Sequence, residues 1–199
     1  MKRPATSSIV VFVVIILVTA VIAAAVGLGT DGATAITVGD QTMSAKAVND
    51  ELRAFADNEA FTKAVEQAGG QVSIAPGSLQ AGGATGLVTL MVYGMMLDDA
   101  LSRQGERVTA ADRGDGAATV RENFGNGYRT FPRWLRDRLE QRYATIQAVS
   151  RVTGSDRAFN QFVKRAARRA DVTVDPAYGY WSTARVRVTP YPTPLTPQG

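Results

Sequence analysis

Residues 87–104 read LVTLMVYGMMLDDALSRQ and form the most apolar segment of the chain outside its N-terminus. Its apolar side chains recur at helical spacing over a wide face. They are Leu87, Leu90, Met91, Met95, Leu97 and Leu101, with Val88, Val92 and Met96 beside them. The segment is too short, and too charged at its end, to be a membrane span. We expect a buried or groove-lining helix that ends near Gly105.

The residues before this segment predict a strand followed by a helix. Residues 36–43, ITVGDQTM, alternate as a short strand does, and the turn-forming pair Gly39-Asp40 lies inside them. Ser44 is well placed to cap a helix over 45–58, because a serine hydroxyl accepts a hydrogen bond from the first turn.

Glycine separates the next elements. Six glycines and a proline in residues 69–86 predict a loop before the apolar helix. After that helix, Thr109 is the expected cap of a weak helix, because Gly114 and Gly116 interrupt it at about 1 kcal/mol each relative to alanine. We expect residues 123–132, NFGNGYRTFP, to form a loop.

The last part of the chain predicts two helices and a strand. A helix is expected over 132–152, with the apolar stripe Leu135, Leu139, Tyr143, Ile146 and Val149. Ser155 or Asp156 is the expected cap of a final helix to about Ala170, with Phe159, Phe162, Val163 and Ala166 facing inward. DVTV at 171–174 is the second predicted strand.

These elements predict a mainly α fold. It consists of an N-terminal transmembrane helix and one five- to six-helix domain, closed by a short two-stranded β pair. The predicted boundaries are a signal anchor at 1–29, a linker at 30–35, the helical domain at 36–189 and a proline-rich disordered tail at 190–199. The tail has four prolines in ten residues.

An uncharged apolar run at residues 9–28 predicts a membrane anchor. Its 20 residues would form a helix roughly 30 Å long, which matches the hydrocarbon core of a bilayer. Lys2 and Arg3 precede the run and the next charge is Asp31, so we expect residues 30–199 on the extracytoplasmic side. The alternative is a cleaved signal peptide and a secreted protein, since residues 23–25 and 33–35 both resemble cleavage sites.

The amino-acid composition excludes several classes of function. The chain has no cysteine, so it carries no disulfide, and no histidine, the commonest general base and metal ligand. Residues 31–102 have a net charge of 3 − 9 = −6, and residues 103–170 of 15 − 7 = +8. The basic half would suit nucleic acid, but export and the lack of a recognisable nucleic-acid module argue against it. Solvated helix faces, or contact with anionic lipid or with the acidic half, are the alternatives.

Three stretches, taken in order, resemble the SurA-like chaperones of actinobacterial type. They are ITVGDQTMSAKAVNDELRAFADN (36–58), LVTLMVYGMMLDDALSRQGERVTAAD (87–112) and ADVTVDPAYGYW (170–181). The first is similar to the family's strand, cap and amphipathic helix. The second resembles its long helix and the following turn, and the third its closing strand.

The resemblance implies a helical module that holds unfolded polypeptide in a crevice. Many members of the family also carry a parvulin-type isomerase domain before the last helix. The helix at 132–152 runs almost directly into the one at 155–170, which leaves no room for that domain. The histidines of parvulin sites are also missing. The resemblance therefore implies a chaperone-like module without isomerase activity.

The candidate peptide-binding residues combine flexible methionines with large aromatic rings. They are Leu87, Met91, Met95, Met96, Phe124, Tyr128, Phe131 and Trp134. The alternative for the methionines is ordinary core, and for the aromatics a hydrophobic plug or hinge. Without a P-loop, a Gly-x-Ser-x-Gly element or calcium-loop spacing, we expect no enzyme, metal or cofactor.

The function we expect is therefore a membrane-tethered extracytoplasmic chaperone-like module that binds non-native exported polypeptide. The alternative is a structural or scaffold protein of the cell envelope that binds one fixed protein partner. Promiscuity separates the two, because only the first should act on several unrelated unfolded proteins.

Overall fold

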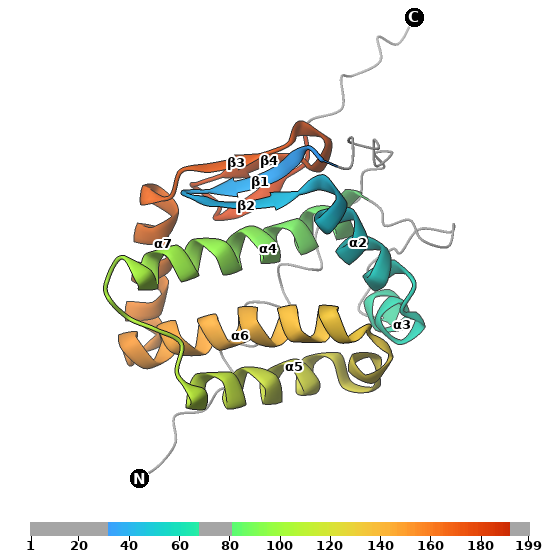
Figure 1. The fold of residues 1–199 in the computed structure, drawn as a ribbon, viewed down its shortest axis with the longest axis horizontal. Helices are drawn as coiled ribbons and strands as arrows, with labels where there is room; N and C mark the ends of the chain where they lie inside the picture. The colour runs from blue at the N-terminus through green and yellow to red at the C-terminus, as the bar shows by residue number, and fades with distance from the viewer. Residues whose placement is uncertain (1–31, 68–80, 192–199) are drawn as a thin grey trace, which may run out of the picture.

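The computed structural model describes residues 32–67 and 81–191 (Figure 1). The predicted anchor at 1–29, the start of the linker at 30–35 and the end of the tail at 190–199 lie outside the described residues. So does most of the predicted loop at 69–86.

The described residues form a mainly helical fold with small antiparallel sheets. The elements, in chain order, are β1 (Thr34–Val38), β2 (Gln41–Ser44), α2 (Ala45–Ala56), α3 (Glu59–Gln67), α4 (Ala81–Ser102), α5 (Ala110–Thr130), α6 (Arg133–Thr153), α7 (Asp156–Arg169), β3 (Val172–Val174), η1 (Pro176–Tyr178), β4 (Tyr180–Ser182) and β5 (Arg187–Thr189).

Helix α4 is the centre of the fold. The strands lie on one side of it and the antiparallel pair α5 and α6 on the other, while α7 and α2–α3 flank its two ends (Figure 1). A helix that is apolar on all sides needs such cover on all sides. Its segment Ala84–Ser102 is, within the described ranges, the one helix long and apolar enough to cross a membrane. Since 61% of that segment is buried inside the domain, α4 is a core helix.

The predicted strand pair exists within a larger set of strands. β1 pairs antiparallel with β3, and Ile36 lies opposite Val174. The predicted single strand over 36–43 is wrong, because Gly39 takes a left-handed φ of 56° and folds the segment into the hairpin β1–β2. A second sheet, β4–β5, was not predicted at all, since its strands are only three residues long each.

The predicted helix caps are confirmed. The Ser44 hydroxyl accepts a hydrogen bond from the Ala47 amide at 3.2 Å, and the Ser155 hydroxyl accepts one from Ala158. Thr109 forms a reciprocal capping box with Asp112 at the start of α5. The apolar stripes predicted for α6 and α7 are buried as expected.

Helix α5 departs from the prediction. It continues through Gly114 and Gly116, and residues 123–130 of the predicted loop 123–132 are helical, apart from a kink at Gly125 (φ 49°, ψ −126°). Close packing explains why Gly116 is tolerated. A Cβ at position 116 would lie 2.5 Å from the backbone nitrogen of Ala144 on α6, so α5 and α6 approach each other through this glycine. The predicted loop at 69–86 also ends earlier than expected, because α4 begins at Ala81.

The contrast between Gly116 and Gly114 is a testable prediction. Gly116→Ala forces α5 away from α6 and should lower the free energy of unfolding by about 2 kcal/mol, as overpacking does. Gly114 has no atom within 4 Å of its would-be Cβ, so Gly114→Ala should instead stabilise by about 0.5–1 kcal/mol. Urea unfolding followed by circular dichroism measures both. Equal effects of the two variants would contradict the close approach at Gly116.

Asp112 makes stability depend on pH. Burial alone would raise the pKa of Asp112. Hydrogen bonds from the Thr109 backbone and hydroxyl and from Arg151 outweigh it, so the pKa is lowered. The ionised carboxylate therefore stabilises the fold above the ordinary aspartate pKa of about 4, and this contribution is lost as the pH falls through the folded-state pKa.

Asp112→Asn should therefore cost about 1 kcal/mol at pH 7, the difference between a charged and a neutral hydrogen-bond acceptor. The gap between wild type and variant should narrow as the pH falls toward 3. Urea unfolding at several pH values measures this gap, and a gap that stays constant would show that the charge of Asp112 does not matter.

Candidate functional site

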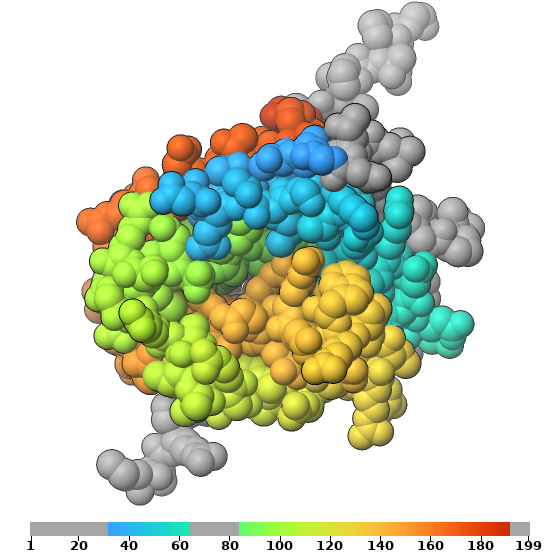
Figure 2. All heavy atoms as spheres, in the orientation of Figure 1, coloured from blue at the N-terminus to red at the C-terminus, as the bar shows by residue number. Residues whose placement is uncertain are grey.

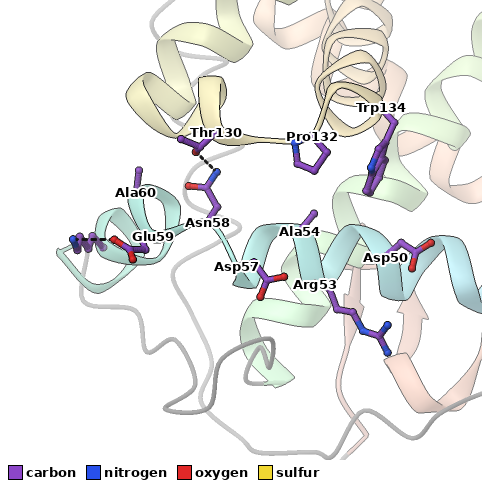
Figure 3. A pocket seen from close by; sticks show the side chains of 11 residues that line it. Asp50, Arg53, Ala54, Asp57, Asn58, Glu59, Ala60, Thr130, Pro132 and Trp134 are labelled. Atoms are coloured by element: carbon purple, nitrogen blue, oxygen red, sulfur yellow. Dashed lines mark hydrogen bonds and ion pairs between the residues drawn. The ribbon is translucent and has the colours of Figure 1, made fainter.

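An open groove of about 810 Å³ lies between α2, the start of α3 and the start of α6. We call it the α2–α6 groove. Figure 2 shows the start of α6 lying against α2 and α3, and Figure 3 shows the groove from close by. Its lining residues are Asp50, Arg53, Ala54, Asp57, Asn58, Glu59, Ala60, Lys63, Thr130, Pro132 and Trp134.

Helix α2 supplies one wall of the groove because it has two faces. Its apolar face, which includes Val48, Leu52 and Phe55, is buried in the core. The groove residues Asp50, Arg53, Ala54 and Asp57 stand three and four positions apart, so they share a different face of the same helix.

Trp134 and Pro132 form the opposite wall. Both extend from the start of α6 toward Ala54 on α2 (Figure 3). Trp134 is 38% exposed, which is unusual for so large an apolar side chain. The guanidinium of Arg138, one turn further along α6, lies 5.3 Å from the centre of its indole ring. This cation–π contact orients the ring at the mouth of the groove.

A buried ion pair holds the two walls together. The carboxylate of Glu51 on α2 is fully buried. Arg142 donates to both of its oxygens, at 2.6 and 2.8 Å, and Arg138 donates to Oε1 at 2.8 Å. Gly94 on α4 makes room for this arrangement, because a Cβ there would lie 2.8 Å from Cγ of Arg142. Arg138 thus contacts Glu51 and Trp134 together, so the ion pair and the groove share one side chain.

Asn58 closes one end of the groove. Its side-chain oxygen accepts from the Phe61 amide and caps α3, while its Nδ2 donates to the Gly127 carbonyl and the Thr130 hydroxyl, each at 2.8 Å. Its side-chain hydrogen bonds therefore join α3 to the end of α5. The end of the groove is rigid as a result.

Four packed rings lie beneath this end of the groove. They are Phe55, Phe61, Phe124 and Phe131, and five of their six pairs have ring centroids 5.0 to 6.1 Å apart. The rings come from α2, α3, the end of α5 and the residue after it, so they join the same elements that form the groove.

Most of the predicted peptide-binding residues are buried in the core or packed against it. Leu87, Met91, Met96 and Phe131 are at most 3% exposed, because α4 is covered on both sides and Phe131 lies among the packed rings. Met95 and Phe124 are partly buried against the same core. The structure places Met91 and Met96 in the core and not in a groove on α4, so the alternative of ordinary core describes these two residues better.

Tyr128 and Trp134 have different surroundings. Tyr128 donates a hydrogen bond to Glu140, and the guanidinium groups of Arg121 and Arg136 lie 5.7 and 5.6 Å from the centre of its ring. That hydrogen bond, together with burial, raises the pKa of Tyr128. Of the eight predicted residues, only Trp134 lines the α2–α6 groove. The spacing of Asp50, Arg53, Ala54 and Asp57 is the sequence signal that would have revealed the other wall.

The groove combines a small apolar surface with exposed charged groups. Its apolar surface comes from Trp134, Pro132 and small alanines, and its charged groups are solvent-exposed. Three of them take part in exposed ion pairs within a helix, Lys63 with Glu59 at 3.5 Å and Asp50 with Lys46 at 2.6 Å. Within the described ranges, no three acidic, histidine or cysteine side chains gather as a metal site would require.

The ion pair predicts a large effect for Arg142→Met. It leaves Glu51 buried with a single arginine, so the free energy of unfolding should fall by about 3–5 kcal/mol. Lys46→Ala, which breaks an exposed pair on the same helix as Glu51, should change it by at most about 0.5 kcal/mol. The double variant Glu51→Met/Arg142→Met should lose less than Arg142→Met alone, since no unpaired charge stays buried. Urea unfolding measures all three, and a double variant as unstable as the single one would contradict this account.

Comparison of the chain with protein-family models, with curated proteins and with solved structures finds no match. The resemblance to SurA-like chaperones therefore stays a prediction from the three sequence stretches.

Proposed function

We propose that this chain is a polypeptide-binding module, in which the α2–α6 groove holds a segment of another protein without a chemical reaction. The observation that carries the proposal is Trp134, a large half-exposed side chain held at the mouth of an open groove by Arg138. Tryptophan is enriched among the residues that dominate the energy of protein interfaces. The alanines and Pro132 offer a small apolar contact area, and the charged side chains form a polar rim around it.

The groove supports one defined partner better than many unfolded clients. A promiscuous holding chaperone needs a broad or flexible apolar surface. The methionines that would supply one are in the core, and among the described residues the exposed large apolar side chains are Trp134, Tyr180 and Tyr191. A scaffold or adaptor role in the cell envelope is therefore our first candidate. Chaperone-like binding of exported polypeptide is the second, favoured by the resemblance and by the openness of the groove.

The proposal includes membrane attachment through residues 9–28. With the first described strand starting at Thr34, only a few residues would separate the domain from the bilayer. The groove would then meet its partner close to the extracytoplasmic membrane surface. We assign no catalytic residue, metal or cofactor.

Trp134→Ala tests the proposal in the full chain, expressed in its own host. A photoreactive amino acid placed at Ala54, in the groove, should crosslink to a protein partner when the chain is expressed in its own host. Trp134→Ala should reduce that crosslink at least tenfold, because a central interface tryptophan contributes about 2 kcal/mol or more. Tyr180→Ala is the matched control, since Tyr180 is equally exposed at 38% but lies on β4 outside the groove.

The pattern of crosslinks separates the two candidates. One dominant Trp134-dependent product indicates a fixed partner. Many products, together with Trp134-dependent suppression of aggregation for several unrelated unfolded proteins, indicate a chaperone-like module. If Trp134→Ala and Tyr180→Ala behave alike, or if neither crosslinks nor suppression depend on Trp134, the groove is not a polypeptide-binding site.

A further inference from the structure

Helix α7 carries an unusually basic solvent face. Arg157, Lys164, Arg165, Arg168 and Arg169 are all exposed, and we call these five residues the α7 basic face. Within the part of the chain that the structure describes, none of the five pairs with a carboxylate. The opposite face of α7 is buried, with Phe159 and Phe162 in the core, so the helix presents its cations on a rigid support.

Three arginines come together beside part of this face. A depression of about 110 Å³ lies between the end of α4 and α7, and Arg103, Arg165 and Arg169 line it. The one carboxylate there, Asp99, is already paired with Arg103, whose Nε donates to Oδ1 at 3.0 Å. Arg165 and Arg169 are thus left to bind an incoming group. Arginine suits phosphate particularly well, because its planar guanidinium donates two parallel hydrogen bonds to phosphate oxygens.

A nucleic acid and an anionic membrane could both bind the α7 basic face, but they require different additional side chains. Proteins that bind single-stranded nucleic acid add aromatic side chains on which bases stack. The exposed large apolar side chains of the described residues are Trp134, Tyr180 and Tyr191, and none of them lies on α7. A membrane surface needs only a row of cations facing many phosphates. The apolar run at 9–28 would also hold the domain within reach of that surface.

We propose that the α7 basic face docks on the anionic phospholipid surface of the membrane, with a lipid phosphate in the depression formed by Arg103, Arg165 and Arg169. This proposal rests on the membrane attachment in the proposed function but not on the groove. Helix α7 and the elements α2–α3 lie at opposite ends of the central helices (Figure 1), so docking through α7 leaves the α2–α6 groove free for a protein.

A single fluorescent label tests this docking in the full chain. The chain has no cysteine, so Gln161→Cys on the exposed side of α7 and Glu122→Cys on α5 each give one unique labelling site. The labelled chains are placed in nanodiscs of phosphatidylcholine alone or with added phosphatidylglycerol, together with lipid spin-labelled at the headgroup. The label at position 161 should be quenched only when phosphatidylglycerol is present, and high salt should reverse the quenching. The label at position 122 should not respond.

Charge variants identify the residues responsible. Each basic residue near an anionic surface contributes a factor of about five to binding, so Arg165→Gln/Arg169→Gln should lower the ratio of docked to undocked chain about 25-fold. Arg113→Gln/Arg129→Gln on α5 removes the same charge from exposed arginines elsewhere and should leave the quenching unchanged. Circular dichroism checks that both variants are folded.

Three results would overturn the proposal. The first is equal quenching at position 161 in both lipid compositions, and the second is equal loss of quenching in the two double variants. The third is Arg165- and Arg169-dependent binding of a fluorescent RNA oligonucleotide without any effect of phosphatidylglycerol, which would indicate a nucleic-acid surface. Trp134→Ala should keep the lipid response, so failure of groove binding and failure of lipid docking are separate outcomes.

Discussion

The buried carboxylate of Glu51 is the interaction on which the arrangement of the domain depends. Removing a carboxylate from water is costly unless its charge is matched, and Arg142 and Arg138 match it with three hydrogen bonds of 2.8 Å or less. The geometry needs α2 and α6 at a fixed separation and a glycine at position 94 on α4. The Glu51 side chain therefore fixes the positions of α2, α4 and α6 relative to one another. Through Arg138 it also orients Trp134.

The same ion pair explains how the two oppositely charged halves of the sequence are joined. Glu51 belongs to the acidic half of the sequence and Arg142 to the basic half. Their ion pair therefore joins the two halves in the interior of the domain. The cations of α7 remain outside this contact, on a helix whose apolar face is already buried. The charge segregation of the sequence therefore appears in the structure as two separate features, a buried Glu51–arginine ion pair inside the domain and an unpaired basic surface on α7.

Prediction from sequence worked where local chemistry decides the outcome. The caps at Ser44, Thr109 and Ser155 depend on a hydroxyl a few residues from the amide it accepts from, and all three are present. It failed where a distant contact overrides local preference. Gly116 weakens an isolated helix, yet it allows α5 and α6 to pack closely, so α5 continues past it. The candidate site shows the same limit, because a methionine-rich stripe looks alike in a groove and in a core, and only the cover on both sides of α4 distinguishes them.

The mainly helical class, the positions of most helix starts and the apolar faces of α6 and α7 could be predicted from the sequence alone, because they follow from spacing and from hydrogen bonds between near neighbours. Tertiary structure alone decided which apolar residues are sealed and which are exposed. It brought Trp134 to α2, paired Glu51 with arginines about 90 positions away, and left the basic face of α7 without a covering partner among the described residues. The physical reason is that burial and buried charge pairing depend on neighbours far apart in the chain. The residue types show that such contacts are needed, and only the packed fold shows where each one is made.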